Sequence, residues 1–390
     1  MAASLICYAG AIWWSLAVAL LFFTFGCGLL QPFLQRRRAT ALGRPPVSAL
    51  IPIKSLDPGF ERAQASIFTQ NYADYEILIS SAEADSPALA AARKVAEAHP
   101  SRPCRFVHSD SSAAVSPKLN NLAAPLIQAR HDFVMTKDSN MTLDSDTMAA
   151  FMQNFVAGVG LVVATPVAVR PKTFGARVEA LLINGHARLL LTASVLGLGF
   201  GVGKVMVFRR SDLAKTGGIE VISDALAEDT AISMALAGIG LKTVFAHRTV
   251  AQEIVAKTLS DVFQRQFRWS VIRRANERFS YPLEPLSSAL PAALAAALAA
   301  PLVGSPAWVA FCLTLFGWFA AEMVFAALKG WEISVWSPLA FLGREIVSLA
   351  AWLRGWTTHD VVWASRRFDA REGAQNADVP AIGRDDARPR

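Results

Sequence analysis

The first 35 residues of the chain contain no charged side chain. Residues 6–34 are almost entirely apolar, which is long enough to cross a bilayer core of about 30 Å. A cleavable signal peptide would begin with positive charge and have a shorter apolar core, and neither feature is present. An uncleaved transmembrane anchor is therefore predicted for residues 1–35, and the rest of the chain must fold next to a membrane.

Four arginines follow this anchor directly, at positions Arg36, Arg37, Arg38 and Arg44. Arginines beside a span favour the cytoplasmic side, so the next domain is predicted to face the cytoplasm from the inner membrane. The chain carries 38 basic and 31 acidic residues, a net charge of +7, which favours a lipid headgroup or a nucleotide phosphate as partner. Because the arginines accompany apolar segments, nucleic acid is not expected.

Membrane segments are also predicted near the other end, within residues 284–360. The apolar runs 286–303 and 307–328 are joined by Gly304-Ser305-Pro306 and are typical of a transmembrane hairpin. A third run, 338–356, contains charged residues that are costly in lipid, so it could span, re-enter or lie in the interface.

Beyond the membrane segments, residues 365–390 are charged and poor in apolar side chains. Such a composition cannot bury enough apolar surface to offset the entropy of ordering, so this tail is predicted to be disordered.

The middle of the chain, residues 45–255, alternates short β-rich runs with helical stretches. Ser86-Pro87 and Ser116-Pro117 are typical helix starts. Strands separated by helices indicate an α/β domain of right-handed βαβ units around a mostly parallel sheet. Its ligand is then expected beyond the carboxyl ends of the strands. The strands are predicted at residues 48–53, 75–80, 105–109, 132–139, 160–169 and 204–208.

Asp138, in the stretch TKDSN, lies at the end of the fourth predicted strand. A carboxylate there could bind a divalent cation that holds a diphosphate, because hard cations prefer oxygen ligands. A simple turn that closes the strand explains the residue equally well. Asn140 leaves no second carboxylate two residues further on.

Glu228 and Asp229 open a predicted helix in SDALAEDTAIS (223–233), where acidic residues often only favour the helix dipole. The functional interpretation makes Asp229 a general base that takes a proton from an acceptor hydroxyl. In SPKLNNL (116–122), Lys118 lies at another helix start, which suits a phosphate, although an ordinary polar first turn is the simpler explanation.

A basic and aromatic helix is predicted over residues 256–280, where Arg265 and Arg268 share one face and Trp269 adjoins them. Such a helix could rest on anionic lipid. Alternatively, an arginine could neutralise a leaving diphosphate, since guanidinium groups match phosphate geometry. Trp269 could stack on a sugar or border the acceptor. The aliphatic stretch 187–201 is too short to span comfortably, so it is either an interfacial ledge or a buried core helix.

The motifs PIKSLDPG, ADSP, SPKLNNL, KDSN, AEDTAIS and RQFRW follow one another in this order. Their order and spacing resemble the ceramide glucosyltransferases, a membrane-bound group of family 21 type that is related to family 2 glycosyltransferases. The resemblance covers roughly residues 45–275 and extends to a bacterial branch associated with hopanoids. RQFRW fits the group's [Q/R]xxRW signature.

The resemblance implies a GT-A (nucleotide-diphosphosugar transferase, Rossmann-like) fold, a UDP-sugar donor, a divalent cation (Mg²⁺ or Mn²⁺) and an inverting displacement. It also implies residue roles: Asp138 would bind metal and diphosphate, and Asp229 would be the catalytic base. Arg265, Arg268 and Trp269 would contact the diphosphate and sugar, while Lys54 would line the nucleotide pocket. Lys118, from its place at a helix start, is a further candidate for donor binding. The group's first aspartate, which would contact the uracil or the ribose, is replaced here by Glu83, with Asp85 as the second choice.

The expected activity is transfer of a sugar, glucose first, from UDP to a lipid hydroxyl such as that of ceramide. A hopanoid acceptor, with N-acetylglucosamine as the sugar, is the close alternative. A processive polysaccharide synthase is disfavoured because the chain offers few spans for an export channel. A non-catalytic membrane protein that keeps the fold is the alternative from another class, since Glu83 and Asn140 depart from the pattern.

Overall fold

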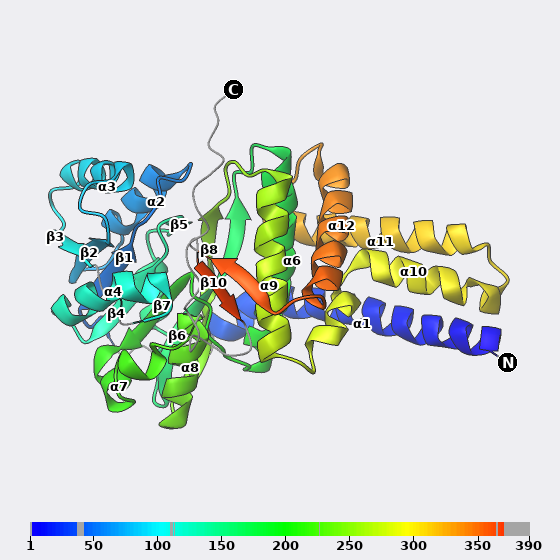
Figure 1. Ribbon diagram of the computed structural model, residues 1–390, viewed down its shortest axis with the longest axis horizontal. Coiled ribbons are helices and arrows are strands. Elements are labelled where there is room, and N and C mark those ends of the chain that lie inside the picture. Colours follow the sequence, from blue (N-terminus) through cyan, green and yellow to red (C-terminus); the bar gives the residue numbers. More distant parts are fainter. Residues whose placement is uncertain are drawn as a thin grey trace.

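A computed structural model describes residues 2–36, 43–109, 112, 114–225, 227–363 and 366–369. Apart from residues 366–369, the charged tail predicted over residues 365–390 lies outside this part of the chain, as do Arg37 and Arg38. Figure 1 shows a sheet domain at one end, three upright helices in the middle, and a bundle of helices that projects away from both.

An eight-stranded mixed sheet forms the centre of the first part, in the order β3-β2-β1-β4-β7-β6-β8-β5. The neighbouring pairs from β3 to β4 are parallel, whereas β7 runs antiparallel to both β4 and β6. The strands are β1 (Val47–Pro52), β2 (Tyr75–Ser81), β3 (Cys104–His108), β4 (Phe133–Lys137), β5 (Met141–Thr142), β6 (Val159–Val169), β7 (Val205–Arg209) and β8 (Lys242–Glu253).

The α/β class and all six predicted strands are confirmed, whereas the expectation of a mostly parallel sheet holds only for its first half. The strand β8 was not predicted. It pairs in parallel with β6 but antiparallel with β5, so the second half of the sheet mixes both directions. Pairing direction depends on long-range contacts that strand patterns do not encode.

Two apolar cores lie on opposite faces of the sheet. Along β1, Ala49 and Ile51 belong to one core and Leu50 to the other, because successive side chains of a strand point to opposite faces. The first core is covered by α2 (Phe60–Phe68), α3 (Pro87–Glu97) and α5 (Thr147–Met152). The second is covered by α4 (Pro117–Gln128), α7 (Arg210–Lys215) and α8 (Glu228–Gly238).

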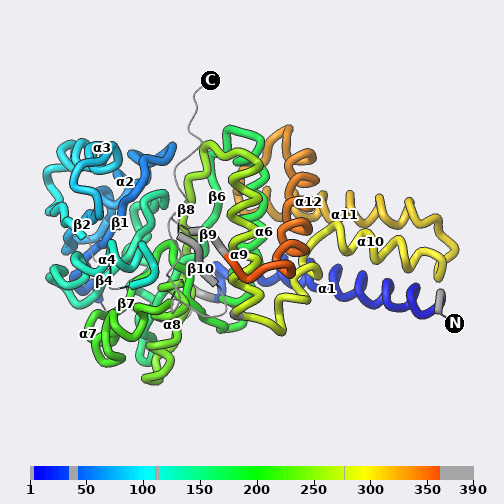
Figure 2. Tube along the Cα trace, viewed as in Figure 1, coloured from blue at the N-terminus to red at the C-terminus, as the bar shows by residue number. Residues whose placement is uncertain are grey.

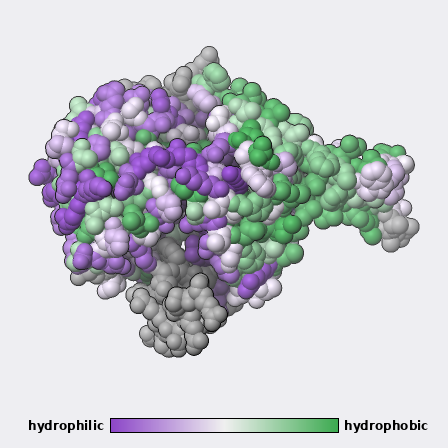
Figure 3. Space-filling model, turned by 90° about the horizontal axis from the view of Figure 1, so that it is seen from above, coloured by the Kyte–Doolittle hydropathy of each residue, from purple (hydrophilic) through white to green (hydrophobic). Residues whose placement is uncertain are grey.

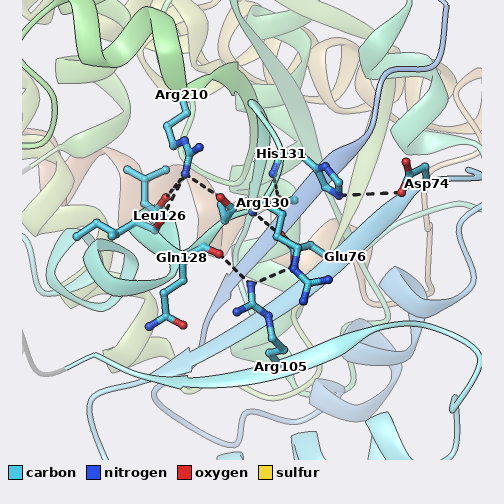
Figure 4. A network of polar contacts seen from close by, with 11 residues as sticks. Asp74, Glu76, Arg105, Leu126, Gln128, Arg130, His131 and Arg210 are labelled. Carbon is cyan, nitrogen blue, oxygen red and sulfur yellow. Dashed lines mark hydrogen bonds and ion pairs between the residues drawn. The ribbon is translucent and has the colours of Figure 1, made fainter.

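A polar network closes the amino-terminal edge of the sheet around the buried side chain of Glu76 (Figure 4). Its carboxylate accepts hydrogen bonds from the Ser48 hydroxyl and the Arg130 backbone N–H, and it pairs with Arg105. Burial alone would raise the pKa of Glu76, but these donors hold it below its usual value. The edge opposite the expected ligand site is therefore fixed by ionic and hydrogen-bonding contacts.

The projecting bundle consists of α1 (Ala2–Arg36), α10 (Ala289–Ala299) and α11 (Ala307–Leu328). Figure 2 shows α1, from the start of the chain, lying beside α10. Ser4–Leu34 and Ala307–Leu328 are long and apolar enough to cross a membrane, as predicted. The first arm of the predicted hairpin, 286–303, begins at a bend of 81° between Tyr281–Ser287 and Ala289–Val303, and these two helices pass the test for a span only as a bent pair. Figure 3 shows apolar surface over this bundle and hydrophilic surface over the sheet domain.

Three helices stand between the bundle and the sheet: α6 (Phe174–Leu196), α9 (Leu259–Asn276) and α12 (Ser337–Gly355) (Figure 1). The predicted third apolar run forms α12, which packs against α6 and α9. Its Arg344 and Glu345 are buried and paired with each other, and Arg344 also pairs with Glu322 of α11. These charges are stabilised by protein partners rather than exposed to lipid.

The first part of the aliphatic stretch 187–201 is the buried core helix of the two predicted alternatives. Up to Leu196 it belongs to α6, where Ala187 and Leu191 are buried. After the left-handed cap at Gly197, the side chains of Leu198 and Phe200 are exposed. A short two-stranded sheet of β9 (Asp360–Trp363) and β10 (Arg366–Asp369) adjoins α9.

Candidate active site

A cavity of about 650 Å³ opens at the carboxyl-terminal edge of β1, β2 and β4, where the sequence placed the ligand. Asp85 is exposed and is not among the residues that line it, which favours Glu83 of the two predicted nucleoside-contacting residues. The other predicted site residues all border this single cavity: Lys54, Glu83, Lys118, Asp138, Asp229, Arg265, Arg268 and Trp269.

Local sequence rules position these side chains. Ser116 caps α4 by accepting from the Leu119 N–H, and Pro117 fills the first helical turn, so Lys118 begins the helix at the cavity. The helix α9 starts with a capping box between Thr258 and Asp261. Lys54, Glu83 and Asp138 follow the ends of β1, β2 and β4.

The Lys118 ammonium is the centre of the ionic contacts in the cavity. It lies 2.6 Å from Asp138 Oδ1 and 2.8 Å from Glu228 Oε1, and it donates to the Gly203 carbonyl at 2.5 Å. Burial would lower the pKa of Lys118, but the two carboxylates raise it well above its usual value. Lys118 is therefore charged at every physiological pH and holds three segments of the cavity wall together.

Replacement of Lys118 by Met is expected to reduce the free energy of unfolding by about 3 kcal/mol, because Glu228 would remain buried without its cation. Lys215→Met is the matched control, since that ammonium pairs with Asp212 at 2.8 Å but is mostly exposed, and a change below about 1 kcal/mol is expected. Denaturant unfolding of both variants measures the difference. Equal midpoints for the two variants would contradict the role of Lys118.

Asp138 is bound by two ammonium groups, because Lys204 Nζ lies 2.7 Å from its Oδ2 atom. Burial would raise the pKa of Asp138, but Lys118 and Lys204 lower it to about 2. Asp138 is therefore ionised in a wall that already places two positive charges against one carboxylate. The excess positive charge there suits the oxygens of a diphosphate, whereas a divalent cation would have to displace the ammonium groups from the carboxylate.

A divalent cation fits this donor set as a site with one carboxylate. The two ammonium groups on Asp138 carry the same total charge as such a cation, which could take over the carboxylate oxygens. Across the described ranges, three or more His, Cys, Asp or Glu side chains are nowhere grouped to hold a metal. Phosphate oxygens of a substrate would thus have to complete the coordination, as is common for Mg²⁺.

Asp229 differs from its neighbour Glu228 in what it contacts. Its Oδ2 accepts the Gly203 N–H at 2.6 Å and its Oδ1 accepts the Thr230 N–H at 2.8 Å. These donors are neutral backbone groups, whereas Glu228 is paired with the Lys118 ammonium. Asp229 is thus oriented, and among the described residues no cation forms an ion pair with it, which suits a proton acceptor.

The two arginines of α9 are not equivalent. Arg265 is paired with Glu179 of α6, a carboxylate that is only 1% exposed. Arg268 has no carboxylate partner within the part of the chain that the structure describes. Burial lowers the pKa of Arg268, and Arg265 adds to the shift. Arg268 is therefore the cation with the greatest need for an anionic ligand, and Trp269 borders the same cavity.

Lys137 precedes Asp138 and is fully buried, with a hydrogen bond of 3.4 Å from its ammonium to the Asp138 carbonyl. Burial lowers the pKa of Lys137 to about 7, and Asp138 opposes the shift only in part. An unfolded lysine titrates near 10.4, so between about pH 7 and 10 the unfolded chain binds more protons at this residue than the folded chain. The contribution of Lys137 to stability therefore increases as pH rises through this window.

The wild-type chain is thus expected to gain about 1–2 kcal/mol from this residue between pH 7 and 8.5. Lys137→Met keeps the side-chain length but cannot titrate, so its unfolding midpoint should lack this part of the rise. Thermal unfolding of both proteins across the pH series gives the comparison. Parallel curves would show that Lys137 is charged inside the folded chain at pH 7.

Three residues that the sequence interpretation missed contribute to this site: Gly203, Lys204 and Glu179. A Cβ atom at Gly203 would lie 3.0 Å from Asp229 Oδ2, a tight contact, so a larger residue there would push this carboxylate away. Lys204 reaches Asp138 because β7 begins beside the end of its antiparallel neighbour β4. The apolar runs that predict strands do not indicate which strands pair, so this contact could not be predicted from the sequence.

The family model described as glycosyl transferase family 21 matches residues 11–376, nearly the whole chain. The chain belongs to glycosyl transferase family 21. This family 21 protein is therefore an enzyme that transfers sugar, and the expected family membership and GT-A type α/β fold are confirmed. With two helices able to cross a bilayer, it is a membrane glycosyltransferase whose substrates are a nucleotide sugar and a lipid.

Relatives of this family 21 enzyme include Ceramide glucosyltransferase 1 of Caenorhabditis elegans, 25% identical over 341 residues, covering 85% of this chain and 73% of the relative. Ceramide glucosyltransferase 3 of the same species is 24% identical over 85% of this chain and 74% of its own length. Ceramide glucosyltransferase of Komagataella phaffii is 27% identical over 52% of this chain and 45% of its own.

Similar solved structures include the mannosyltransferase PcManGT from Pyrobaculum calidifontis in complex with GDP-Man and Mn²⁺, with a TM-score of 0.49 and 17% identity. That alignment covers 88% of this chain and 99% of the other. Residues 1–349 of S. aureus TarS align with a TM-score of 0.37 and 13% identity, over 83% of this chain and 95% of that chain.

Proposed function

We propose that this family 21 enzyme transfers glucose from UDP-glucose to the hydroxyl group of ceramide or a ceramide-like lipid, with inversion at the sugar carbon. The names of its relatives support the sugar and the acceptor. The observation that carries the proposal is one cavity bordered by the Asp229 carboxylate and the Arg268 guanidinium, neither of which forms an ion pair within the part of the chain that the structure describes.

The donor would lie along the carboxyl ends of the parallel strands. Lys54 and Glu83, after β1 and β2, are proposed to contact the nucleoside, and Asp85 is the weaker candidate because it lies outside the cavity lining. Lys118 and Asp138 line the same cavity, and the diphosphate is proposed to bind beside them. Arg268, Arg265 and Trp269 enter from α9 on the opposite wall and would contact diphosphate and sugar.

Asp138 is proposed to hold a divalent cation, Mg²⁺ or Mn²⁺, which when bound would neutralise charge on the diphosphate. Two lysine side chains of this chain already place positive charge at the position proposed for the cation. Lys118 and Lys204 already lie against Asp138, and a phosphate that entered would find their ammonium groups within the same wall.

In the proposed reaction, Asp229 accepts the proton of the lipid hydroxyl as that oxygen forms a bond to C1 of the sugar. The bond between C1 and the diphosphate oxygen breaks at the same time, and UDP leaves with the bonding electrons. Attack opposite the leaving group inverts C1. The backbone N–H groups of Gly203 and Thr230 fix the orientation of the carboxylate for this step.

The enzyme is proposed to lie in the inner membrane with more than one span and with its sheet domain in the cytoplasm, where UDP-sugars are made. The four arginines after the anchor support this orientation. Figure 3 shows how abruptly hydrophilic surface changes to apolar surface between the sheet domain and the helices. A lipid hydroxyl would therefore need to rise only as far as the interface.

Lipid extraction followed by mass spectrometry tests the product directly. The chain is expressed in a host that makes no glycosylated ceramide, grown with ceramide or with a hopanoid precursor, and an inactive Asp229→Asn strain serves as control. A new hexosylceramide that is absent from the control is expected. A hexosaminyl hopanoid in its place would support the alternative acceptor, and no new glycolipid in either culture would contradict the proposal.

A further inference from the structure

The helix α12 exposes apolar side chains and turns its charged ones inward. Four of its side chains, three, four and seven residues apart in sequence, lie on one side of the helix and are 44–63% exposed. These residues form the α12 stripe: Leu339, Leu342, Ile346 and Leu353. Away from the stripe, Arg344 and Glu345 are only 6% and 3% exposed and are paired with each other. A helix that faces water shows the opposite arrangement, so the α12 stripe requires an apolar partner.

Protein does not supply this partner among the described residues. The helix α12 packs against α6 and α9, and the stripe remains exposed. The charged end of the chain, residues 365–390, is poor in apolar side chains and does not match an apolar row. Figure 3 shows apolar surface that continues from the projecting bundle over the middle of the molecule. This continuity indicates that the surroundings of the bundle also cover the middle helices.

The helix α12 belongs to a layer that lies across the membrane-spanning helices. Figure 1 shows α12 running across the direction of α1 and α11, the two helices able to cross a bilayer. The 3₁₀ helix η2 (Tyr281–Ser287) joins this layer, because the Tyr281 hydroxyl donates to the Trp352 carbonyl at 2.8 Å and Trp352 Nε1 donates to the Tyr281 carbonyl at 3.0 Å. After η2 the chain turns by 81° into α10, so it leaves the layer and enters the bundle at this point.

The length of α10 gives the depth of this layer. The start of α10 marks the level of α12, because the Leu290 N–H donates to Glu345 Oε2 at 2.7 Å. From there to the far end of the bundle, α10 and the 3₁₀ helix η3 (Ala300–Val303) have 11 and 4 residues. At about 1.5 Å for each residue they reach roughly 22 Å. A hydrocarbon core is about 30 Å thick, which leaves about 8 Å for the layer that contains α12.

The two ends of α12 carry side chains that suit lipid headgroups. Trp336 and Trp356 flank the helix and are 50% and 45% exposed. Tryptophan is enriched at the level of the headgroups, where its ring lies in apolar surroundings and its N–H reaches water. Arg354 is exposed in the last turn, and its guanidinium carbon lies 4.7 Å from the centre of the Phe267 ring of α9. A long arginine side chain in this position can reach a lipid phosphate.

We propose that α12 is an interfacial helix, which lies in the leaflet next to the sheet domain with the α12 stripe among the acyl chains. Helices of this kind lie about 5–10 Å into the boundary between headgroups and acyl chains, which agrees with the thickness left over by α10. The helix α9, which carries Arg268 and Trp269, packs on α12. The donor cavity is thus held one helix away from the lipid. This placement does not depend on which sugar or acceptor the enzyme uses.

Electron paramagnetic resonance of the full-length enzyme in phosphatidylcholine nanodiscs tests the placement. A nitroxide carried by an unnatural amino acid replaces Leu342 or Ile346, one position at a time, so the four cysteines stay in place. Collisions with dissolved oxygen report acyl chains, and collisions with a water-soluble nickel chelate report water. Both labels are expected to collide more with oxygen than with the chelate, at a depth of about 5–10 Å.

Two exposed apolar residues provide matched controls for the label. Met234 of α8, in the sheet domain, is 69% exposed, and Phe316, near the middle of α11, is 68% exposed. A label in place of Met234 should report water. A label in place of Phe316 should lie deeper in the bilayer than either label on α12, because α11 crosses the core.

Three results would overturn the proposal. If the α12 labels are as accessible to the chelate as the label at position 234, the stripe lies in water. If they are as deep as the label at position 316, α12 lies in the hydrocarbon core rather than at its boundary. If they collide with neither reagent, another protein surface, such as a second copy of the chain, covers the stripe.

Discussion

Asp229→Asn is expected to lower the rate of sugar transfer by about 10²- to 10⁴-fold while leaving the affinity for UDP-sugar unchanged. An amide occupies the same volume as the carboxylate but cannot accept the proton of the lipid hydroxyl. The donor contacts proposed for Lys118, Asp138 and Arg268 do not involve this side chain. Steady-state transfer to ceramide, together with equilibrium binding of UDP-glucose, separates the two effects.

Asp224→Asn is the matched control, since Asp224 is exposed on the same segment and is not among the residues that line the donor cavity. Its transfer rate should equal that of the wild type. A second comparison uses Glu228→Gln, which removes an ion-pair partner of Lys118. This variant should lower the free energy of unfolding more than the rate of transfer. If Asp229→Asn transfers sugar at the wild-type rate, another group must be the base.

Arg268→Met is expected to reduce kcat by about 10²- to 10³-fold, comparable to the loss of an electrostatic donor at a site of developing charge. The leaving diphosphate gains negative charge as its bond to the sugar breaks, and Arg268 is the guanidinium of the cavity without a carboxylate partner among the described residues. The effect should appear in kcat more than in KM, because the added charge exists mainly in the transition state.

Arg265→Met offers a contrast within the same helix. Arg265 neutralises Glu179, so its removal leaves a buried carboxylate unpaired and should lower stability more than kcat. Arg278→Met, an exposed arginine beyond the end of α9, is the neutral control. Equal losses of kcat for Arg265→Met and Arg268→Met would mean that the ion pair with Glu179 opens during the reaction.

The positions of most strands and several catalytic candidates could be predicted from the sequence because their signals are local. Buried apolar runs predicted the positions of β1, β2, β4 and β6. Ser-Pro pairs predicted the first residues of α3 and α4. Asp138 was recognisable as a residue after a strand, which in an open sheet places it at the ligand edge. The order of the motifs then connected Asp229 and the α9 arginines to the same cavity.

What could not be predicted depends on contacts between distant segments. The antiparallel pairing of β7 with β4, which brings Lys204 to Asp138, is specified by the whole sheet. The sequence left open whether the apolar run 338–356 spans, re-enters or lies in the interface. In the structure its Arg344 is buried and paired with Glu322, and the run forms the packed helix α12. Another cavity, of about 610 Å³, is bordered by residues of α6, α9, α10, α11 and α12, so the sequence pattern of any one of these helices does not predict it.

The most direct test of the whole account is the release of UDP from UDP-glucose by the purified enzyme in nanodiscs, measured with and without ceramide. We expect slow release of UDP without the lipid, strong stimulation by ceramide, and no stimulation in Asp229→Asn. Equal release with and without the lipid would contradict a transfer reaction at this cavity, as would stimulation that persists in Asp229→Asn.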